Sequence, residues 1–483
     1  MDTKKLRQKI LDLAIRGKLV PQDPNDEPAS VLLERIRAEK EQLIKEGKIK
    51  RSKKSAATDK SHYENVPFEI PESWAWVTLS EVCEVARGGS PRPIKDYLTT
   101  NEDGVNWIKI GDTDKDGKYI NSTKEKIIPE GVHRSRFVHK GDFLLTNSMS
   151  FGRPYILNID GCIHDGWLVI SPFANTYVTE FLYFLLSSSF AYDQFADAAS
   201  GGVVSNLNSD KVANSYFPLP PEREQRRIIN ELNNWFKVVG ELDKNIQGVK
   251  SFVSRIKSKI LDLAISGKLV PQDPNDEPAI ELLKRINPDF KPCDNSHYEN
   301  LPQGWVKLRL GDVCSFERGI TFPSSAKCTI KQPGMIACIR TANVQDNLEL
   351  DDLWYVGNEY IKGNTEKLVR KNDIIMSSAN SRELVGKVSY VHDLTEQMTF
   401  GGFVLNIRAN ECILHFFLFL ILRTLYLKGY YLTIATQTTN IANLNTKILG
   451  NIEVLLPPLT EQVRIINTVN KILARIDNIT AEL

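Results

Sequence analysis

The sequence predicts an α+β protein of two domains of mixed strands and helices, arranged as a pseudo-twofold tandem repeat and separated by long antiparallel coiled-coil helices. Three observations support this prediction. Some segments recur almost unchanged in the two halves of the chain, and a heptad pattern of apolar residues runs through the middle. Between the recurring segments lie two dissimilar stretches of short strand patterns, each with one apolar helix near its end.

The recurring segments are the strongest signal. KILDLAIRGKLVPQDPNDEP at 9–28 returns at 259–278 with the single change from Arg16 to Ser266. Four shorter pairs follow in the same order: 61–67 with 296–302, 76–91 with 305–323, 205–208 with 442–445, and 220–230 with 457–467. The chain is therefore a tandem duplication of about 240 residues.

The two stretches between these segments, 92–200 and 324–435, share little beyond a coarse pattern. A duplication under uniform structural demand would diverge evenly. We infer that the constant segments meet a common partner and that the variable stretches meet different targets. Gene conversion or recent duplication of the constant segments alone is the alternative.

Apolar residues follow the Pro-Pro pair at 220–221 with alternating spacings of four and three. They are Ile228, Leu232, Trp235, Val239, Leu242, Ile246, Val249, Val253, Ile256, Ile260 and Leu263. This spacing is typical of a coiled-coil helix, and Gly267 with Pro271 is a plausible stop. An unbroken helix from 224 to 266 would be roughly 64 Å long at ~1.5 Å per residue.

The second copy of this pattern is divided between the two ends of the sequence. Its first part is Ile465, Val469, Ile472, Ile476, Ile479 and Leu483, and its second part is Leu6, Ile10 and Leu13. Placed antiparallel, the two helical rods would relate the two variable stretches by a pseudo-twofold axis. A coiled coil with a purely structural role is the alternative, but it does not explain the split.

Composition excludes little. The formal net charge is +1, with 42% hydrophobic and 25% charged residues, as in ordinary globular proteins. Seven cysteines without a CxxC pair fit a reducing compartment, so we expect a cytoplasmic protein. The most apolar stretch, 412–427, is interrupted by His415 and Arg423 and is too short for a membrane span, so a buried helix is expected there.

This layout resembles the specificity subunit of type I restriction-modification enzymes over nearly the whole chain. The resemblance rests on PPEREQ at 220–225, PPLTEQ at 457–462, the repeated ILDLAI-GKLVPQD, W-V-x-L at 76–79 and 305–308, and ARGGSP at 86–91. It implies two target recognition domains, each reading one half of a split, asymmetric site in double-stranded DNA. It also implies constant helices that set the spacing and dock two methylation subunits, with restriction subunits as further partners.

We accordingly divide the chain into a constant segment and linker, a recognition domain, a central constant region with the spacer helix, a second recognition domain and a terminal helix. Their expected bounds are 1–60, 61–219, 220–286, 287–456 and 457–483.

No catalytic or metal-binding residue is expected in this chain. It has no G-x-x-x-x-G-K-[ST] loop and no HExxH motif, so S-adenosylmethionine and ATP with magnesium are expected on partner subunits. The nearest match to a methyltransferase Asn-Pro-Pro-aromatic loop is NPDF at 287–290, which we interpret as a helix-ending turn. The alternatives are a stand-alone methyltransferase and a scaffold that binds two proteins and no DNA.

Residues expected to contact DNA are arginines, a lysine and small polar residues in predicted loops, because arginine pairs bidentately with guanine and serine or asparagine reach other base edges. In the first domain they are Arg87, Ser90, Arg92, Lys109, Arg134, Arg136, Ser150 and Arg153. In the second domain they are Arg318, Thr321, Ser324, Arg340, Asn343, Ser378, Asn380 and Arg382. For Trp107 core packing is the favoured interpretation, and His164 is expected to be structural.

The basic run KEGKIKRSKKS at 45–55 occurs only in the first copy. A solvated linker is the ordinary interpretation of such a run, and a phosphate-contacting arm is the alternative.

Overall fold

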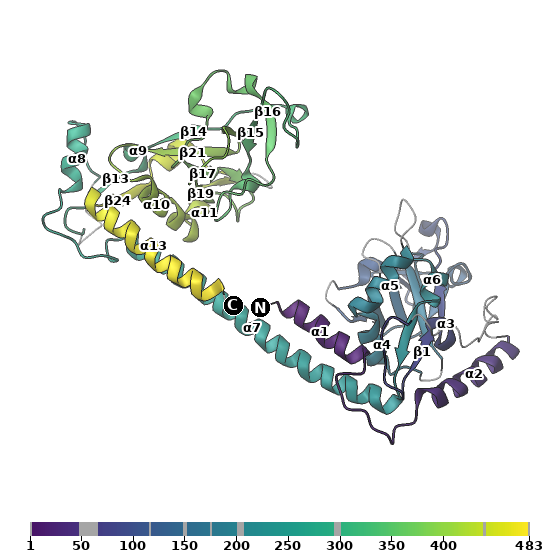
Figure 1. Ribbon diagram of the computed structural model, residues 1–483. Coiled ribbons are helices and arrows are strands. Elements are labelled where there is room, and N and C mark those ends of the chain that lie inside the picture. The colour runs from purple at the N-terminus through teal and green to yellow at the C-terminus, as the bar shows by residue number, and fades with distance from the viewer. Residues whose placement is uncertain are drawn as a thin grey trace. The chain divides into compact units, whose positions relative to one another are not determined.

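The computed structural model describes residues 2–47, 66–114, 117–147, 152–173, 176–199, 207–293, 301–437 and 441–481. It forms two compact units, Met1–Asn245 and Ile246–Leu483, each built from helices and small sheets (Figure 1). Ser150 and most of the basic run at 45–55 lie outside the described residues.

The larger helices of the first unit pack against one of its sheets. The helices of this unit are α1 (Thr3–Ile15), α2 (Ala29–Lys45), α3 (Leu79–Val82), α4 (Thr179–Leu186), α5 (Ser189–Ala199), α6 (Ser209–Ala213) and the first part of α7 (Glu222–Ile265). The strands are β1 (Ala75–Thr78), β2 (Cys83–Arg87), β3 (Leu98–Thr99), β4 (Val105–Ile108), β5 (Tyr119–Ile120), β6 (Glu125–Ile127), β7 (Arg136–Val138), β8 (Phe143–Thr146), β9 (Pro154–Leu157), β10 (Gly161–Ile163), β11 (Trp167–Pro172) and β12 (Tyr216–Leu219).

Two five-stranded sheets form the body of the first unit, in the orders β2-β11-β8-β9-β5 and β3-β6-β4-β10-β7. Successive side chains of a strand point to opposite faces of its sheet. On β8, Phe143 and Leu145 join the core shared with α1, α2, α4, α5 and α7, whereas Leu144 joins the core shared with Ile108 of β4 and Ile163 of β10. The unit is therefore layered as helices, sheet and sheet.

The second unit repeats this arrangement. Its helices are the remainder of α7, α8 (Ala279–Ile286), α9 (Leu310–Val313), α10 (His415–Leu427), α11 (Tyr430–Ile434), α12 (Thr446–Gly450) and α13 (Leu459–Ala481). Its strands are β13 (Val306–Arg309), β14 (Cys314–Arg318), β15 (Met335–Ile339), β16 (Trp354–Gly357), β17 (Ile374–Ser377), β18 (Ala379–Asn380), β19 (Val388–Tyr390), β20 (Met398–Phe400), β21 (Val404–Ala409), β22 (Thr436–Gln437), β23 (Ala442–Asn443) and β24 (Glu453–Leu456).

The same strand order recurs in both units although the sequences between the constant segments differ. Among the described residues, β14-β21-β17-β19 corresponds to β2-β11-β8-β9, and β16-β15-β20 corresponds to β6-β4-β10. In both of these sheets the corresponding strand pair is parallel, β4 with β10 and β15 with β20. The variable stretches therefore have a common framework.

The predicted long helix is present as α7, one continuous helix of 44 residues. In the first unit α1 lies along it, because Thr3 Oγ1 donates a hydrogen bond to Asp243 at 3.2 Å and the Arg7 guanidinium lies 5.4 Å from the Phe236 ring. In the second unit α13 lies along its later part, where Lys257 pairs with Asp477.

The helix ends where the sequence predicted a stop. Gly267, two residues past the last helical residue, has φ +70°, a conformation that glycine adopts without steric cost.

Two helices predicted in the variable stretches have different outcomes. The buried helix expected in the apolar stretch 412–427 is confirmed as α10, and within the described ranges no helix is long and apolar enough to cross a membrane. The single apolar helix expected near the end of the first variable stretch is wrong, since α4 ends at Leu186 and α5 begins at Ser189. Ser188 explains the break, because its hydroxyl donates to the Leu185 carbonyl at 2.6 Å and accepts from the Ala191 amide at 3.2 Å.

The repeated PPxxEQ motif anchors the constant segments through a cluster of polar side chains, here called the helix-start cluster, in which the glutamate and glutamine of each motif are buried. In the first unit it comprises Gln22, Asp26, Glu224, Gln225 and Arg227, and in the second unit Gln272, Asp276, Glu461, Gln462 and Arg464.

Gln22 donates to Glu224 at 2.7 Å, and Arg227 pairs with Asp26 at 2.6 Å. The equivalent distances in the second unit are 3.0 Å and 2.5 Å. Burial raises the pKa of Glu224 and of Glu461, and hydrogen bonds to the carboxylates oppose that rise. The cluster therefore fastens the PQDPNDEP segment to the start of each long helix.

The structure corrects one alignment within the repeat. The sequence match of W-V-x-L pairs Trp76 with Trp305, but the structural counterpart of Trp305 is Trp74. Trp305 Nε1 donates to Glu461 at 3.0 Å. A Cβ on Gly267 would lie 3.1 Å from the Trp305 ring, and a Cβ on the equivalent Gly17 would lie 3.2 Å from the Trp74 ring, so the two tryptophans hold the same place. The sequence match is thus shifted by two positions from the structural match. Because side chains alternate between the two faces of a strand, a shift of two positions still pairs residues that point to the same face.

Candidate nucleic-acid interface

In the first unit, the predicted DNA-contacting residues that the structure describes lie at one edge of the two sheets, here called the first loop edge. Arg87 ends β2, Lys109 follows β4 and Arg136 begins β7. Because β4 and β10 are parallel, Lys109 lies beside the loop that follows Ile163, and β7 pairs Arg136 with Ile163 directly. Residues 22 to 76 positions apart in the chain are thus brought to the same edge.

A hydrogen-bonded network connects the loops of this edge around Asp165, which precedes β11. Ser90 Oγ donates to Asp165 Oδ1 at 2.9 Å, and the Arg92 guanidinium lies 3.4 Å from Asp165 Oδ2. Arg87 Nε and Asn147 Nδ2 donate to the Asp165 main-chain carbonyl at 3.2 Å and 2.9 Å. The loop after β2 and the loop between β10 and β11 therefore form one surface.

Two other cations of the first loop edge are engaged by aromatic rings. Arg134 lies over the Tyr97 ring at 5.4 Å and Arg153 over the Tyr155 ring at 5.3 Å. Such stacking orients a guanidinium while its N–H groups remain able to donate hydrogen bonds.

The second unit builds an equivalent second loop edge. Arg318 ends β14 as Arg87 ends β2, and Arg340 follows β15 as Lys109 follows β4. The amide of Arg340 donates to Asn343, and that of Lys109 donates to Asp112, in the same short turn. Arg340 pairs with Asp352 and Lys109 pairs with Glu125, so each cation is held by a carboxylate of its own domain.

Glycines permit the close contact between loops in both units. A Cβ on Gly88 would lie 2.2 Å from the His164 carbonyl oxygen, and a Cβ on Gly319 would lie 2.2 Å from that of Gly401. The two loops are pressed together in the same way, although their side chains differ.

Some predicted residues are not available at the surface. Asn343 is buried, and its amide holds the turn by donating to the Asp352 carbonyl at 3.0 Å. Ser378 is also buried and donates to the Phe403 carbonyl. These two assignments to DNA contact are corrected, because their polar groups are used within the fold. Trp107 is 1% exposed and packs in the core, as favoured.

The remaining candidates of the second loop edge are exposed. Arg318, Thr321, Ser324 and Arg382 are all exposed, and Asn380 is partly exposed. Lys367, which the sequence analysis did not select, donates to the Arg318 carbonyl at 2.7 Å and pairs with Glu317. In the first unit Arg136 takes the same role on the Arg87 carbonyl at 3.3 Å.

Sequence reasoning also missed Asp165 and Phe403, which lie in the loops that lead from one sheet to the other, between β10 and β11 and between β20 and β21. The available signal was their sequence setting: HDGW at 164–167 and GGFV at 401–404 each place small or polar residues between two apolar strands. Phe403 is 64% exposed, which is unusual for an aromatic side chain in a short loop.

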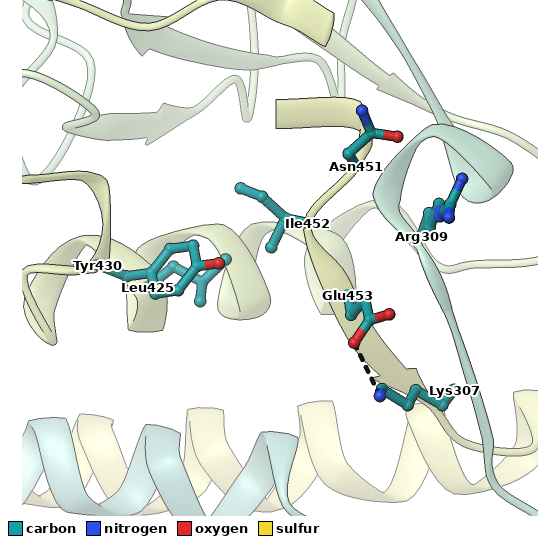
Figure 2. Close-up of a pocket in the computed structure, with 7 residues that line it drawn as sticks. All are labelled: Lys307, Arg309, Leu425, Tyr430, Asn451, Ile452 and Glu453. Atoms are coloured by element: carbon teal, nitrogen blue, oxygen red, sulfur yellow. Dashed lines mark ion pairs between the residues drawn. The ribbon is translucent and has the colours of Figure 1, made fainter. Parts of the chain in front are cut away.

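A pocket of about 400 Å³ lies elsewhere in the second unit (Figure 2). It is lined by Lys307, Arg309, Leu425, Tyr430, Asn451, Ile452 and Glu453. Lys307 and Glu453 form an ion pair of 2.7 Å across β13 and β24. Because Lys307 is almost fully buried, this pair fastens the strand pair that joins the domain to α13.

The comparisons with known proteins agree with this architecture. The model of the type I restriction modification DNA specificity domain matches residues 71–248 and again 302–483. A specificity subunit of a type I restriction enzyme from Escherichia coli, EcoAI, is 30% identical over 452 residues, covering 77% of this chain and 72% of the relative. The MjaIX specificity subunit of Methanocaldococcus jannaschii is 22% identical, covering 81% and 84%.

One solved structure shares the fold. It is described as the structural basis of complex assembly and conformational transition of the type I R-M system, and it has a TM-score of 0.53 at 21% identity, with 86% of this chain and 94% of that chain covered.

Two domains on one framework, each with a polar loop edge, define a tandem DNA-recognition protein. The family model matches both domains, so this chain belongs to the specificity subunits of type I restriction-modification systems.

Proposed function

We propose that each loop edge reads one half of a split, asymmetric site in double-stranded DNA and that the chain itself catalyses nothing. The observation that carries this proposal is the repeated framework with different side chains at the same edge: Lys109 against Arg340, and His164–Asp165 against Gly401–Gly402. One framework with two side-chain sets is suited to reading two different sequences.

The constant segments have a second role in this proposal. Long helix α7 belongs to both units, and α1 and α13 lie along its two parts in the opposite direction. We propose that these helices form the antiparallel spacer of a pseudo-twofold subunit and dock two methylation subunits. Methyl-donor binding, ATP hydrolysis and cleavage belong to the methylation and restriction partners.

The test is methylome sequencing of a methylation-free host. We expect a new split, asymmetric methylated motif when this chain is expressed with its neighbouring methylation subunit, and none with either alone. Methylation from this chain alone would make it an enzyme and contradict the proposal. An assembled, folded complex that produces no motif would favour a scaffold without DNA reading.

Arg92 provides a test of the phosphate contribution. Its side chain is 83% exposed, and within the described part of the chain it contacts Asp165 Oδ2 at 3.4 Å. An arginine this exposed can reach a phosphate at the cost of no more than that one long contact. We expect Arg92→Ala to weaken binding of the assembled complex similarly for cognate and scrambled duplexes, and to reduce the slope of log affinity against log salt by about 1.

The matched control is Lys140→Ala. Lys140 is exposed in the turn after β7, at the end of that strand opposite to Arg136. An equal loss of salt slope in both variants would contradict the assignment of the first loop edge to DNA.

A further inference from the structure

Asp165 is a carboxylate in the middle of a surface rich in arginine. Its side chain is 31% exposed, and Arg87, Arg92, Arg134 and Arg136 lie in the loops and strands around it. Without these arginines, the carboxylate would be repelled by DNA phosphates. Here the surrounding cations offset that repulsion, so the carboxylate can approach a base edge.

The two oxygens of Asp165 have different environments. Oδ1 accepts from Ser90 Oγ at 2.9 Å and lies 2.9 Å from His164 Nε2, whereas among the described residues Oδ2 has a single contact, the 3.4 Å ion pair with the highly exposed Arg92. The carboxylate is therefore fixed mainly through one oxygen, and the partly exposed side chain leaves the other with one long contact that a donor from outside the protein can replace.

The charge state of Asp165 suits an acceptor. Partial burial works to raise the pKa of this carboxyl, but the Ser90 hydrogen bond and the nearby His164 and Arg92 outweigh it, so the pKa lies below its ordinary value. The group is ionised at neutral pH and can only accept hydrogen bonds.

The equivalent loop of the second unit has different chemistry on the same backbone. The Gly88 amide donates to the Trp167 carbonyl and the Gly319 amide to the Val404 carbonyl, so the loops 164–166 and 401–403 occupy equivalent places. By this register Gly402 stands where the first unit has Asp165. Because the backbone is shared and the side chain differs at this position, the residue here is suited to give each unit a different DNA specificity.

We propose that Asp165 reads a base in the half-site of the first unit by accepting a hydrogen bond from the exocyclic amino group of cytosine. In the major groove guanine presents two acceptors and thymine a carbonyl acceptor, which a carboxylate disfavours. Adenine places its N7 acceptor beside its amino group, so cytosine N4 is the best donor. This assignment rests on the proposed function and names a specificity residue within it.

The decisive variant is Asp165→Asn, which keeps the shape of the side chain and replaces a pure acceptor by an amide that also donates. We expect the complex to lose roughly 5- to 150-fold of its preference for cytosine at one position of one half-site, and to accept adenine there. The measurement is competition binding of the complex to duplexes carrying each base at each position, together with the methylome. Asp165→Glu, which displaces the carboxylate, should lower cognate affinity without new acceptance of adenine.

The matched control is Asp160→Asn, an exposed carboxylate at the other end of β10 that accepts the Lys140 amide at 2.7 Å. This variant should leave the motif unchanged. Unchanged discrimination in both Asp165 variants, or an equal loss of affinity for all duplexes, would overturn the assignment while the wild-type motif stands. If the assembled wild-type complex selects no split motif, the proposed function fails and the assignment falls with it.

Discussion

Replacing Gln225 by alanine should destabilise the first unit by about 2 to 4 kcal/mol. Gln225 is fully buried; its Oε1 accepts from the Val178 amide at 2.7 Å, and its Nε2 donates to the carbonyls of Thr176 and Pro220 at 3.1 Å and 3.0 Å. The alanine variant leaves three main-chain polar groups without this partner. Urea unfolding of the full chain, followed by circular dichroism, measures the effect as a lower midpoint of the first unit's transition.

The neighbouring Arg226 supplies the control. It is 63% exposed and pairs with Glu222 one turn away, so Arg226→Ala should change the free energy of unfolding by no more than about 0.5 kcal/mol. Gln462, the repeat counterpart of Gln225, makes the same three kinds of bond, and Gln462→Ala should affect the second unit to a similar extent. A Gln225→Ala variant as stable as Arg226→Ala would show that the helix-start cluster does not stabilise the attachment of the domain to α7.

These glutamines show what the sequence could and could not supply. The repeated PPxxEQ motif predicted where the long helices begin, because Pro-Pro followed by acidic residues is a local signal. Their burial could not be predicted, since the Val178 and Thr176 partners of Gln225 lie 47 and 49 residues away. Heptad spacing is likewise local, and it predicted α7 to within two residues at its start and one at its end.

The sequence predicted which types of residue lie at the loop edges, but not which residues they would contact there. Arginines in Gly/Pro-rich loops indicated a polar surface, and the parallel pairing of β4 with β10 explains why Arg87, Lys109 and Arg136 meet there. Residue type misled at Asn343, whose amide is used in a turn. Residue type also gave no reason to select Asp165, because a carboxylate is not expected to contact DNA. Its neighbours Ser90 and Arg92, which change that expectation, lie more than 70 residues away in the sequence.

The repeat allows a further experiment on recognition, with the largest expected change in specificity. Residues 79–215 and 310–452 begin and end at equivalent backbone positions, since the Leu79 amide donates to the Ser215 carbonyl at 3.2 Å and the Leu310 amide to the Ile452 carbonyl at 2.9 Å. A chimera in which 310–452 replaces 79–215 therefore joins matching strands and keeps both helix-start clusters. We expect its methylated motif to become symmetric, with the half-site of the second unit present twice in inverted orientation.

Inversion follows from the proposed pseudo-twofold relation, because two identical readers related by a twofold axis see the two DNA strands in the same way. The reciprocal chimera, with 79–215 in both places, should yield the other half-site twice. Methylome sequencing reads both outcomes, and co-purification with the methylation subunit verifies assembly. If both chimeras assemble and keep the parental asymmetric motif, sequence reading resides in the constant segments. A direct repeat in place of an inverted one would retain the assignment of the domains and reject the twofold arrangement of the helices.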